Sequence, residues 1–259
     1  MQAAGIGRLH RARILDAGCG LGDMAYGLAC HPHIKSSDIY AFDHSIASVR
    51  QAMSNVGQPA NGNRVYFSTQ DASSLFFGDS SFDLVAGSAV LHHITDYRPF
   101  LRQIFRILKR DGVAIFSEPF FEGYFWPCFL LHLAAQELHL ESLAGPEFGM
   151  ADFMLKDTAY RVQNADDVAA LDPLTDKHYF RAEILSSLAA ELGFRGVRFQ
   201  NVEPARFYDC WMPHFLDVYQ IQHEPLRRKA MQLYDELRSY AGPALPAIAP
   251  HFRYIVLQK

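Results

Sequence analysis

Short apolar runs alternate with amphipathic patterns through the first half of the chain. Five of these runs are typical of strands, and they cover residues 13–16, 38–42, 65–68, 82–87 and 113–117. Apolar positions between the runs recur at helical spacing over residues 23–30, 46–54 and 97–108, and residues 109–112 predict a turn that ends the last helix. This alternation predicts βαβ units and a parallel sheet.

The alternation stops after residue 119, where an aromatic-rich helical stretch begins. Residues 120–177 are predicted to form a helical lid, and residues 203–250 a second helical insertion. The other elements predicted in this half are a helix over 181–192 closed by Gly193, a strand over 197–202 and a strand over 254–257. The pattern therefore predicts a single domain over residues 1–259 that carries two insertions.

A turn of three alternating glycines follows the first strand directly. Residues 14–23 read Ile-Leu-Asp-Ala-Gly-Cys-Gly-Leu-Gly-Asp. Positions without a side chain let the backbone pass within contact distance of a ligand. A dinucleotide-binding turn reads G-x-G-x-x-G, and here Asp23 stands where its third glycine belongs. An acid so close to the phosphate path repels a pyrophosphate, so the spacing disfavours a nicotinamide-dependent oxidoreductase, which stays open as an alternative.

Four further motifs follow this turn in order along the chain. They are Phe42-Asp43 at the end of the second strand, residues 70–72 (Gln-Asp-Ala) after the third, residues 81–85 (Ser-Phe-Asp-Leu-Val) with 91–94 (Leu-His-His-Ile) around the fourth, and residues 108–112 (Leu-Lys-Arg-Asp-Gly) before the fifth. Together with the glycine turn, they resemble the motifs of class I S-adenosylmethionine-dependent methyltransferases of the small-molecule type. The resemblance covers residues 13–119 closely, and 178–202 and 251–259 by fold pattern only.

The resemblance implies an α/β fold with a doubly wound, seven-stranded, mostly parallel Rossmann-like sheet. Numbered along the chain, its strands would lie in the order 3-2-1-4-5-7-6, with the helical segments as insertions. The implied cofactor is S-adenosyl-L-methionine, with the Asp43 carboxylate on the ribose hydroxyls, the Asp71 carboxylate on the exocyclic amine of adenine and the backbone of Ala72 on the base edge. The implied cofactor-binding residues are Asp16, Gly18, Cys19, Gly20, Gly22, Asp43, His44, Asp71, Ala72, Gly87 and Ser88. Turn capping is the alternative role for Asp16 and Asp43, and an Asx turn is the alternative for Asp71.

Candidate catalytic groups follow the fourth and fifth strands, since an open α/β sheet places its site at the carboxyl ends of its strands. His92 and His93 come after the fourth strand, and a histidine that titrates near neutral pH suits a general base. The alternative for both is a loop histidine without a catalytic duty. Glu118 ends the fifth strand, where it either binds a substrate hydroxyl or ammonium or caps the insertion.

The start of the predicted lid is rich in aromatic residues. Residues 120–126 hold five aromatic side chains, and aromatic walls suit an apolar or aromatic acceptor. Phe121, Tyr124 and Trp126 are therefore candidate substrate contacts, together with His178, which precedes the resumed helix. The alternatives are packing of the lid on the core and contact with a membrane surface.

Net charge and the end of the fourth strand indicate which class of acceptor to expect. The formal net charge of −4 over 259 residues gives no electrostatic footprint for nucleic acid. The fourth strand ends Ala-Gly-Ser-Ala, without the N-P-P-[FY] form of nucleic-acid amino-group methyltransferases. Both observations exclude nucleic acid as the expected acceptor and favour a small-molecule substrate.

The four cysteines lie far apart, as expected for reduced thiols in a cytoplasmic protein. No signal peptide and no transmembrane segment are expected, because no apolar run is long enough. No metal site is expected, because the histidines lack an acid at ligand spacing. The predicted function is methyl transfer from S-adenosylmethionine to a small, apolar or aromatic acceptor, with oxygen favoured. The alternative is a methyltransferase-like module that binds the cofactor or a partner without turnover.

An amphipathic helix is predicted within the second insertion. Its apolar positions recur at helical spacing and are Leu226, Ala230, Leu233, Leu237 and Tyr240. This face has two roles open to it, a homodimer interface or packing against its own sheet.

Overall fold

Two compact units make up the computed structural model, which describes residues 7–57, 59, 61–165 and 167–259. The sheet unit consists of Met1–Glu118, Phe180–Gln200 and Tyr254–Lys259, and the helical unit consists of Pro119–Tyr179 and Asn201–Arg253. Both predicted insertions, 120–177 and 203–250, fall within the helical unit.

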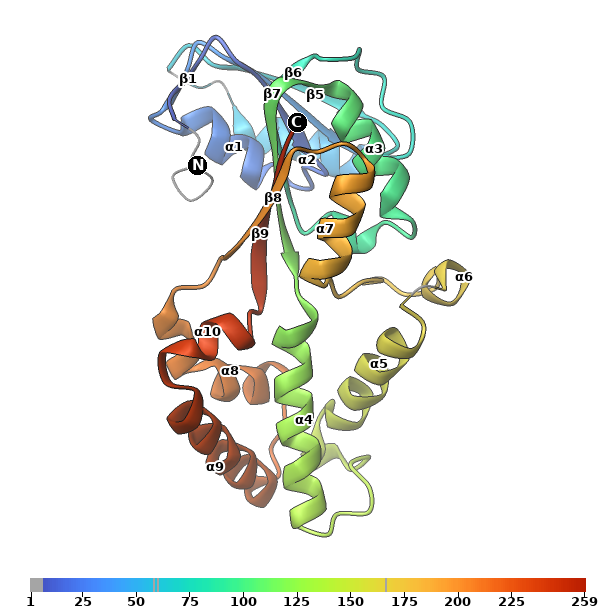
Figure 1. The fold of residues 1–259 in the computed structure, drawn as a ribbon, viewed down its shortest axis with the longest axis vertical. Coiled ribbons are helices and arrows are strands. Elements are labelled where there is room, and N and C mark those ends of the chain that lie inside the picture. The colour runs from blue at the N-terminus through green and yellow to red at the C-terminus, as the bar shows by residue number, and fades with distance from the viewer. Residues whose placement is uncertain (1–6, 58, 60, 166) are drawn as a thin grey trace. The chain divides into compact units, whose positions relative to one another are not determined.

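Seven strands among the described residues form the main sheet, in the spatial order β5-β4-β2-β6-β7-β9-β8 (Figure 1). Their bounds are β2 Arg13–Ala17, β4 Asp38–Asp43, β5 Arg64–Thr69, β6 Phe82–Ser88, β7 Leu108–Pro119, β8 Gly196–Asn201 and β9 Phe252–Gln258. Numbered along the chain, this order is 3-2-1-4-5-7-6, so the predicted topology is confirmed. The pairings that join β5, β4, β2, β6 and β7 are parallel. Two short strands that the pattern did not predict, β1 (Leu9–His10) and β3 (Ile34–Lys35), form a separate parallel pair.

Helices pack on both faces of this sheet, as a doubly wound fold requires. They are α1 Asp23–Cys30, α2 Ile46–Val56, α3 Tyr97–Ile107 and α7 Ala182–Glu191. Successive side chains of a strand point to opposite faces. On β4, Ala41 packs with Ala52 of α2, whereas Phe42 meets Phe100 of α3, with ring centroids 6.4 Å apart. The apolar side chains of β4 therefore pack against helices on both faces of the sheet.

Residues 109–112 lie within β7, so their prediction as a helix-ending turn was wrong. The pairing of β6 with β7 joins Phe82 to Leu108 and Leu84 to Val113, which leaves residues 109–112 outside the backbone register of the two strands. Such an excess on one strand is a bulge. Asp111, inside it, has a φ of 68°, a value typical of tight turns. The residues typical of a turn are therefore present, but they form a bulge within β7.

The helical unit is built on two long helices with a shared apolar core. Its helices are α4 Phe121–Glu137, α5 Ala151–Gln163, α6 Val168–Leu171, α8 Trp211–Val218, α9 Glu224–Ala241 and α10 Leu245–Ile248. Leu226 and Ala230 of α9 are buried in one cluster with Leu131 of α4. Among the described residues, no helix is both long and apolar enough to cross a membrane.

The predicted apolar face of α9 is largely confirmed, with one correction. Leu233 and Leu237 pack against the core cluster, but Tyr240 is 93% exposed. Tyr234, which follows Leu226 and Ala230 at four-residue spacing, occupies the buried face instead. The face packs inside its own unit on helices, not on the sheet.

Candidate functional site

The glycine turn joins β2 to α1 in a conformation that requires glycine. Gly18, Gly20 and Gly22 have φ values of 73°, 49° and 94°, a region that a Cβ disfavours. A Cβ on Gly18 would lie 2.5 Å from Cγ2 of Val90, and a Cβ on Gly22 would lie 2.9 Å from Cγ2 of Val56. Around Gly20, by contrast, the described chain leaves 4 Å of open space where a Cβ would stand. A ligand can therefore reach the backbone at Gly20.

Asp43, the last residue of β4, is hydrogen-bonded to this turn. Its Oδ2 accepts the N–H of Gly20 at 3.0 Å, and its Oδ1 accepts the N–H of Ser45 at 2.9 Å. This is the capping role named above as the alternative. A carboxylate has about four acceptor positions, so two further donors can still be accepted. The ring of the neighbouring His44 is mostly exposed, and its Nδ1 lies 3.3 Å from Oδ1 of Asp43.

Asp16 is a completely buried carboxyl group at the start of the same turn. Within the described part of the chain, neither of its oxygens meets a hydrogen-bond donor. Burial, together with the charge of Asp43, raises the pKa of Asp16 to about 7. The N–H of Ala25 in α1 opposes this shift without reaching hydrogen-bond geometry. A buried carboxylate without a donor is costly, so a cationic group beside it would be stabilised.

Val90 packs against the glycine turn and against the end of β6. A Cβ on Gly87 would lie 3.0 Å from Cγ1 of Val90 and 2.8 Å from Cδ1 of Phe116. Gly87 is therefore explained by close packing on Val90, the residue that also limits Gly18. Ser88, the last residue of β6, is exposed. The pattern of the chain did not identify Val90, because an apolar side chain after a strand carries no local signal.

Asp71 lies exposed after β5, in a segment without a helix. Its Oδ1 accepts the N–H of Ser73 at 2.7 Å, which is the Asx turn named as its alternative role. The N–H of Ser73 lowers the pKa of the Asp71 carboxyl group. Ala72, the next residue, is partly exposed. A role for Asp71 and Ala72 at an adenine stays a prediction.

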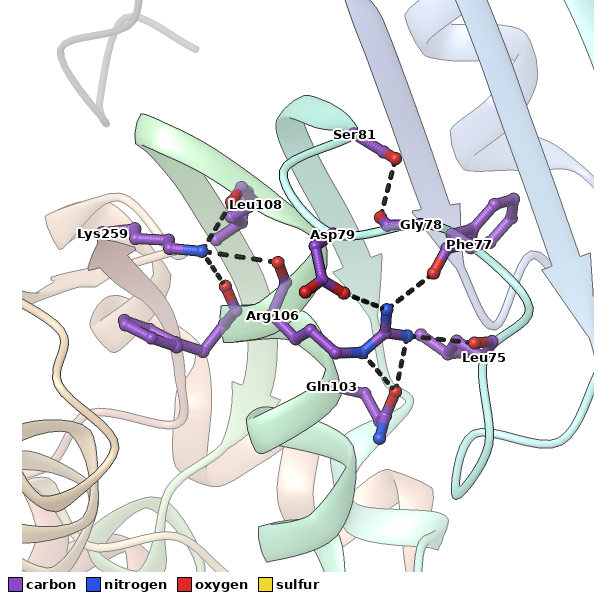
Figure 2. Close-up of polar contacts among 10 residues, drawn as sticks. Leu75, Phe77, Gly78, Asp79, Ser81, Gln103, Arg106, Leu108 and Lys259 are labelled. Carbon is purple, nitrogen blue, oxygen red and sulfur yellow. Dashed lines mark hydrogen bonds and ion pairs between the residues drawn. The ribbon is translucent and has the colours of Figure 1, made fainter.

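Arg106 of α3 anchors the rest of this segment (Figure 2). Its guanidinium donates to the carbonyl oxygens of Phe77 at 2.8 Å and Leu75 at 3.0 Å, and it pairs with Asp79 at 2.7 Å. Lys259 donates to three carbonyl oxygens at the end of the same helix. Local sequence pattern did not identify Arg106 as an anchor, since Leu75, Phe77 and Asp79 lie 27 to 31 positions away.

Glu118 and His92 are brought together at the carboxyl ends of β7 and β6. Oε1 of Glu118 accepts the N–H groups of Val90 at 2.9 Å and Leu91 at 2.8 Å, and Oε2 lies 2.7 Å from Nδ1 of His92. Glu118 is fully buried and His92 nearly so. The carboxylate is thus engaged by the loop that follows β6, and its contact with a substrate stays a prediction. His93 is exposed, with its ring 4.1 Å from that of His92.

The predicted substrate contacts belong to the helical unit. Tyr124 stacks on Tyr179, with ring centroids 4.2 Å apart and an angle of 16° between the rings. Nε1 of Trp126 donates to the carbonyl oxygen of Ile248 at 3.1 Å. The remaining two are Phe121, whose ring lies 5.3 Å from that of Phe125, and His178, which is partly buried.

Known proteins with a similar sequence include methyltransferases. Residues 15–116 match the model of a methyltransferase domain. The chain is 35% identical over 100 residues to the methyltransferase YcgJ of Bacillus subtilis, covering 39% of this chain and 38% of that protein. It is also 35% identical over 105 residues to the O-methyltransferase cnsE of Penicillium expansum, covering 40% and 37%. These matches span well under half the length of either relative.

Solved structures show the same fold. The structure of YcgJ from Bacillus subtilis matches with a TM-score of 0.51 at 18% identity, covering 99% of this chain and 97% of that one. A phosphoethanolamine N-methyltransferase from Haemonchus contortus, solved with S-adenosyl-L-methionine, matches with a TM-score of 0.55 at 17% identity, covering 98% and 50%. With its glycine turn and its strand order, the chain has the fold of solved methyltransferases, and residues 15–116 match a methyltransferase domain.

Proposed function

We propose that the protein transfers a methyl group from S-adenosylmethionine to a small acceptor, with oxygen as the favoured acceptor atom. The observation that carries this proposal is the open backbone at Gly20, whose N–H is bound by Asp43, with the buried carboxyl group of Asp16 at the start of the same turn. Asp23 and these two acids disfavour a pyrophosphate, whereas they are compatible with a ligand that carries an ammonium and a sulfonium.

The residues present fit this cofactor. Asp43 retains the acceptor capacity for two ribose hydroxyls after it has bound the N–H groups of Gly20 and Ser45. The buried carboxyl group of Asp16 lacks a donor in the described chain and favours a nearby cation. When bound, the cofactor supplies the electrophilic methyl group and its own leaving group.

The protein's task is then to orient the acceptor and to remove its proton. We assign the general base to His92, with His93 as the second candidate. Glu118 acts as a positioning residue, because its contact with Nδ1 orients the ring of His92 and its contacts with the N–H groups of Val90 and Leu91 hold the loop. This division matches the rule that a base is itself oriented by a third group.

An apolar or aromatic acceptor is supported by the aromatic side chains of α4 in the helical unit. Phe125 and Phe129 stack at 5.6 Å, and each is more than a third exposed. Phe121, Tyr124, Trp126 and His178 remain the proposed acceptor contacts. A cytoplasmic location is supported by the four cysteines, all of which are free.

Calorimetric titration with S-adenosylhomocysteine tests cofactor binding, and we expect binding in the micromolar range. Absence of binding to the wild-type chain would refute the proposal. Methyl transfer to extract-derived acceptors, followed by mass spectrometry with a labelled methyl group, tests turnover. Binding without any transfer would indicate the alternative, a cofactor-binding module without catalysis.

A further inference from the structure

A pocket of about 800 Å³ lies in the sheet unit, at the edge of the sheet where β6 and β8 begin. It is lined by Leu84 near the start of β6, by Gly196 at the start of β8 and by Gln258 at the end of β9. The glycine turn and His92 follow the opposite, carboxyl ends of β2 and β6. The pocket is therefore separate from the site described above.

The floor of this pocket is apolar. Leu84 and Val256 line it from β6 and β9 and are 1% and 4% exposed, and Val113 lines it from β7 and is partly exposed. Gly196 leaves the side formed by β8 open, because a Cβ there would meet no atom of the described chain within 4 Å. The volume falls within the range of about 300–1,000 Å³ that is usual for small-molecule sites. The pocket can therefore bury a short apolar chain.

Two acids also line the pocket, and each is paired with a cation from outside it. Nζ of Lys109 lies 2.8 Å from both carboxylate oxygens of Asp83, and Nη2 of Arg195 donates to Oδ1 of Asp111. The hydrogen bond from Arg195 lowers the pKa of the Asp111 carboxyl group, so this group is ionised and its charge is used in the pair. Neither acid therefore gives the pocket a surplus negative charge.

Arg110 and Arg198 add two positive charges to the pocket wall. Arg110 is exposed, and within the described part of the chain no hydrogen bond or ion pair engages its guanidinium. Its charge also acts on Asp111, but one carboxylate cannot neutralise both Arg110 and Arg195. A guanidinium presents its N–H groups as a planar fork that matches a carboxylate. The wall therefore offers a cationic donor beside the apolar floor.

We infer that this pocket binds a small organic anion, with a carboxylate on Arg110 and an apolar tail against Leu84, Val113 and Val256. The guanidinium fork selects the carboxylate, and the floor gains from burial of the tail, so a fully hydrated inorganic anion is disfavoured. The inference does not depend on the proposed function, because the pocket shares no residue with the glycine turn.

Titration calorimetry with octanoate and octanamide, in the absence of cofactor, tests the inference. The two probes have the same tail and nearly the same shape, and only octanoate is charged. We expect the wild-type chain to bind octanoate about tenfold more tightly than octanamide, because the charge of the head group strengthens its hydrogen bonds to Arg110. Equal affinities, or no binding of octanoate, would overturn the inference.

Removal of the charge shows which residue holds the head group. Arg110→Gln should bind octanoate about tenfold more weakly than the wild type, and octanamide within about twofold of it. Arg50→Gln is the matched control, because Arg50 is an exposed arginine of α2 outside the pocket. Unchanged affinity for octanoate in Arg110→Gln, or an equal loss in Arg50→Gln, would contradict the inference.

A second variant fills the pocket and tests where the probes bind. Gly196 and Arg198 lie two positions apart on β8, so their side chains share the face that lines the pocket. Gly196→Val keeps a residue that favours strands but occupies this space, so both probes should bind about tenfold more weakly. Gln200→Val, on the same face of β8 but outside the pocket, is the control. Equal binding to these two variants would exclude the pocket as the site.

Saturating S-adenosylhomocysteine separates this pocket from the proposed active site. The affinity for octanoate should stay within about twofold of its value without S-adenosylhomocysteine, because the two ligands bind at opposite edges of the sheet. Competition between them would overturn the inference. If S-adenosylhomocysteine does not bind the wild-type chain, the proposed function fails, and the two probes and the variants still decide this inference.

Discussion

Nδ1 of His92 lies 2.7 Å from Oε2 of Glu118, while Oε1 of the same carboxylate accepts the N–H groups of Val90 and Leu91. One buried carboxylate thus holds a loop backbone and a histidine ring together. Removal of such an acceptor leaves several buried donors without partners, which is more costly than the loss of one exposed hydrogen bond.

Glu118→Ala should therefore lower the free energy of unfolding by about 2–5 kcal/mol, measured by urea denaturation. Glu183→Ala, at an exposed position of α7, is the control and should change it little. Glu118→Gln keeps an acceptor for the backbone and should fold, but it should alter the pH profile of methyl transfer. A loss for Glu118→Ala no larger than that of the control would contradict the assigned positioning role.

Asp43→Ala should weaken S-adenosylhomocysteine binding about 100-fold, because it removes charge-assisted hydrogen bonds of about 1.5–3 kcal/mol. Calorimetric titration measures the change. Asp38→Ala provides a matched control, since Asp38 begins the strand that Asp43 ends and pairs with the exposed Arg64. Similar affinities for the two variants would remove Asp43 from the cofactor site.

Asp16 should make the stability of the ligand-free chain depend on pH. Its folded-state pKa of about 7 lies above the ordinary value of 3.8, so the folded chain holds this proton more tightly than the unfolded chain. The resulting cost is absent below about pH 4, grows between pH 4 and pH 7, and reaches about 4 kcal/mol above pH 7.

Thermal unfolding between pH 5 and pH 8 checks this sign. The wild-type Tm should fall as the pH rises. In the Asp16→Asn variant, which lacks the titrating carboxyl group, the Tm should fall less. In addition, binding of a cationic ligand should release a proton at pH 6, which appears as a buffer-dependent enthalpy. A wild-type Tm that rises across this range in step with the variant would contradict the assignment.

Arg106→Met should lower the free energy of unfolding by about 1–3 kcal/mol, because it leaves the carbonyl groups of Leu75 and Phe77 without their donor (Figure 2). Hydrogen exchange should rise in residues 75–81 before it rises in the rest of the sheet unit. Arg102→Met, one turn earlier on the same helix and exposed, is the control. Unchanged exchange in residues 75–81 would show that Arg106 does not anchor them.

Leu233→Asp should lower the Tm, because Leu233 packs against the core of its own unit. Tyr240→Asp, on the same helix but 93% exposed, should leave the Tm nearly unchanged. Gel filtration tests the homodimer interface that the sequence left open. A shift in elution volume for Leu233→Asp with unchanged Tm would indicate that α9 pairs with a second copy.

Local pattern predicted most of the sheet unit, and long-range contacts explain what it missed. The strands and the glycine turn are visible because periodicity and glycine spacing are properties of neighbouring residues. The carbonyl acceptors of Arg106 and the donors to Glu118 lie more than 25 positions away, so no local spacing reveals them. Residues 109–112 were misread because a bulge exists only relative to a partner strand.

Within the helical unit, helical spacing identified Leu226 and Ala230 but extended the face one turn too far, to Tyr240. Burial of Tyr234 depends on Tyr208, whose carbonyl oxygen accepts its hydroxyl, and that contact joins separate elements. In each case the missing information was the identity of a distant neighbour.

Val90 limits the space at two glycines that lie far apart in the sequence, Gly18 and Gly87. Its methyl groups occupy the space that a side chain would need at Gly18 and at Gly87. Substitutions at Gly87, Val90 and Phe116 should therefore be non-additive, because alanine at 87 becomes acceptable only after both larger side chains have become smaller. Gly18 stays outside this exchange, since its φ of 73° disfavours any Cβ. Covariation among positions 87, 90 and 116 would record a steric constraint and not a chemical role.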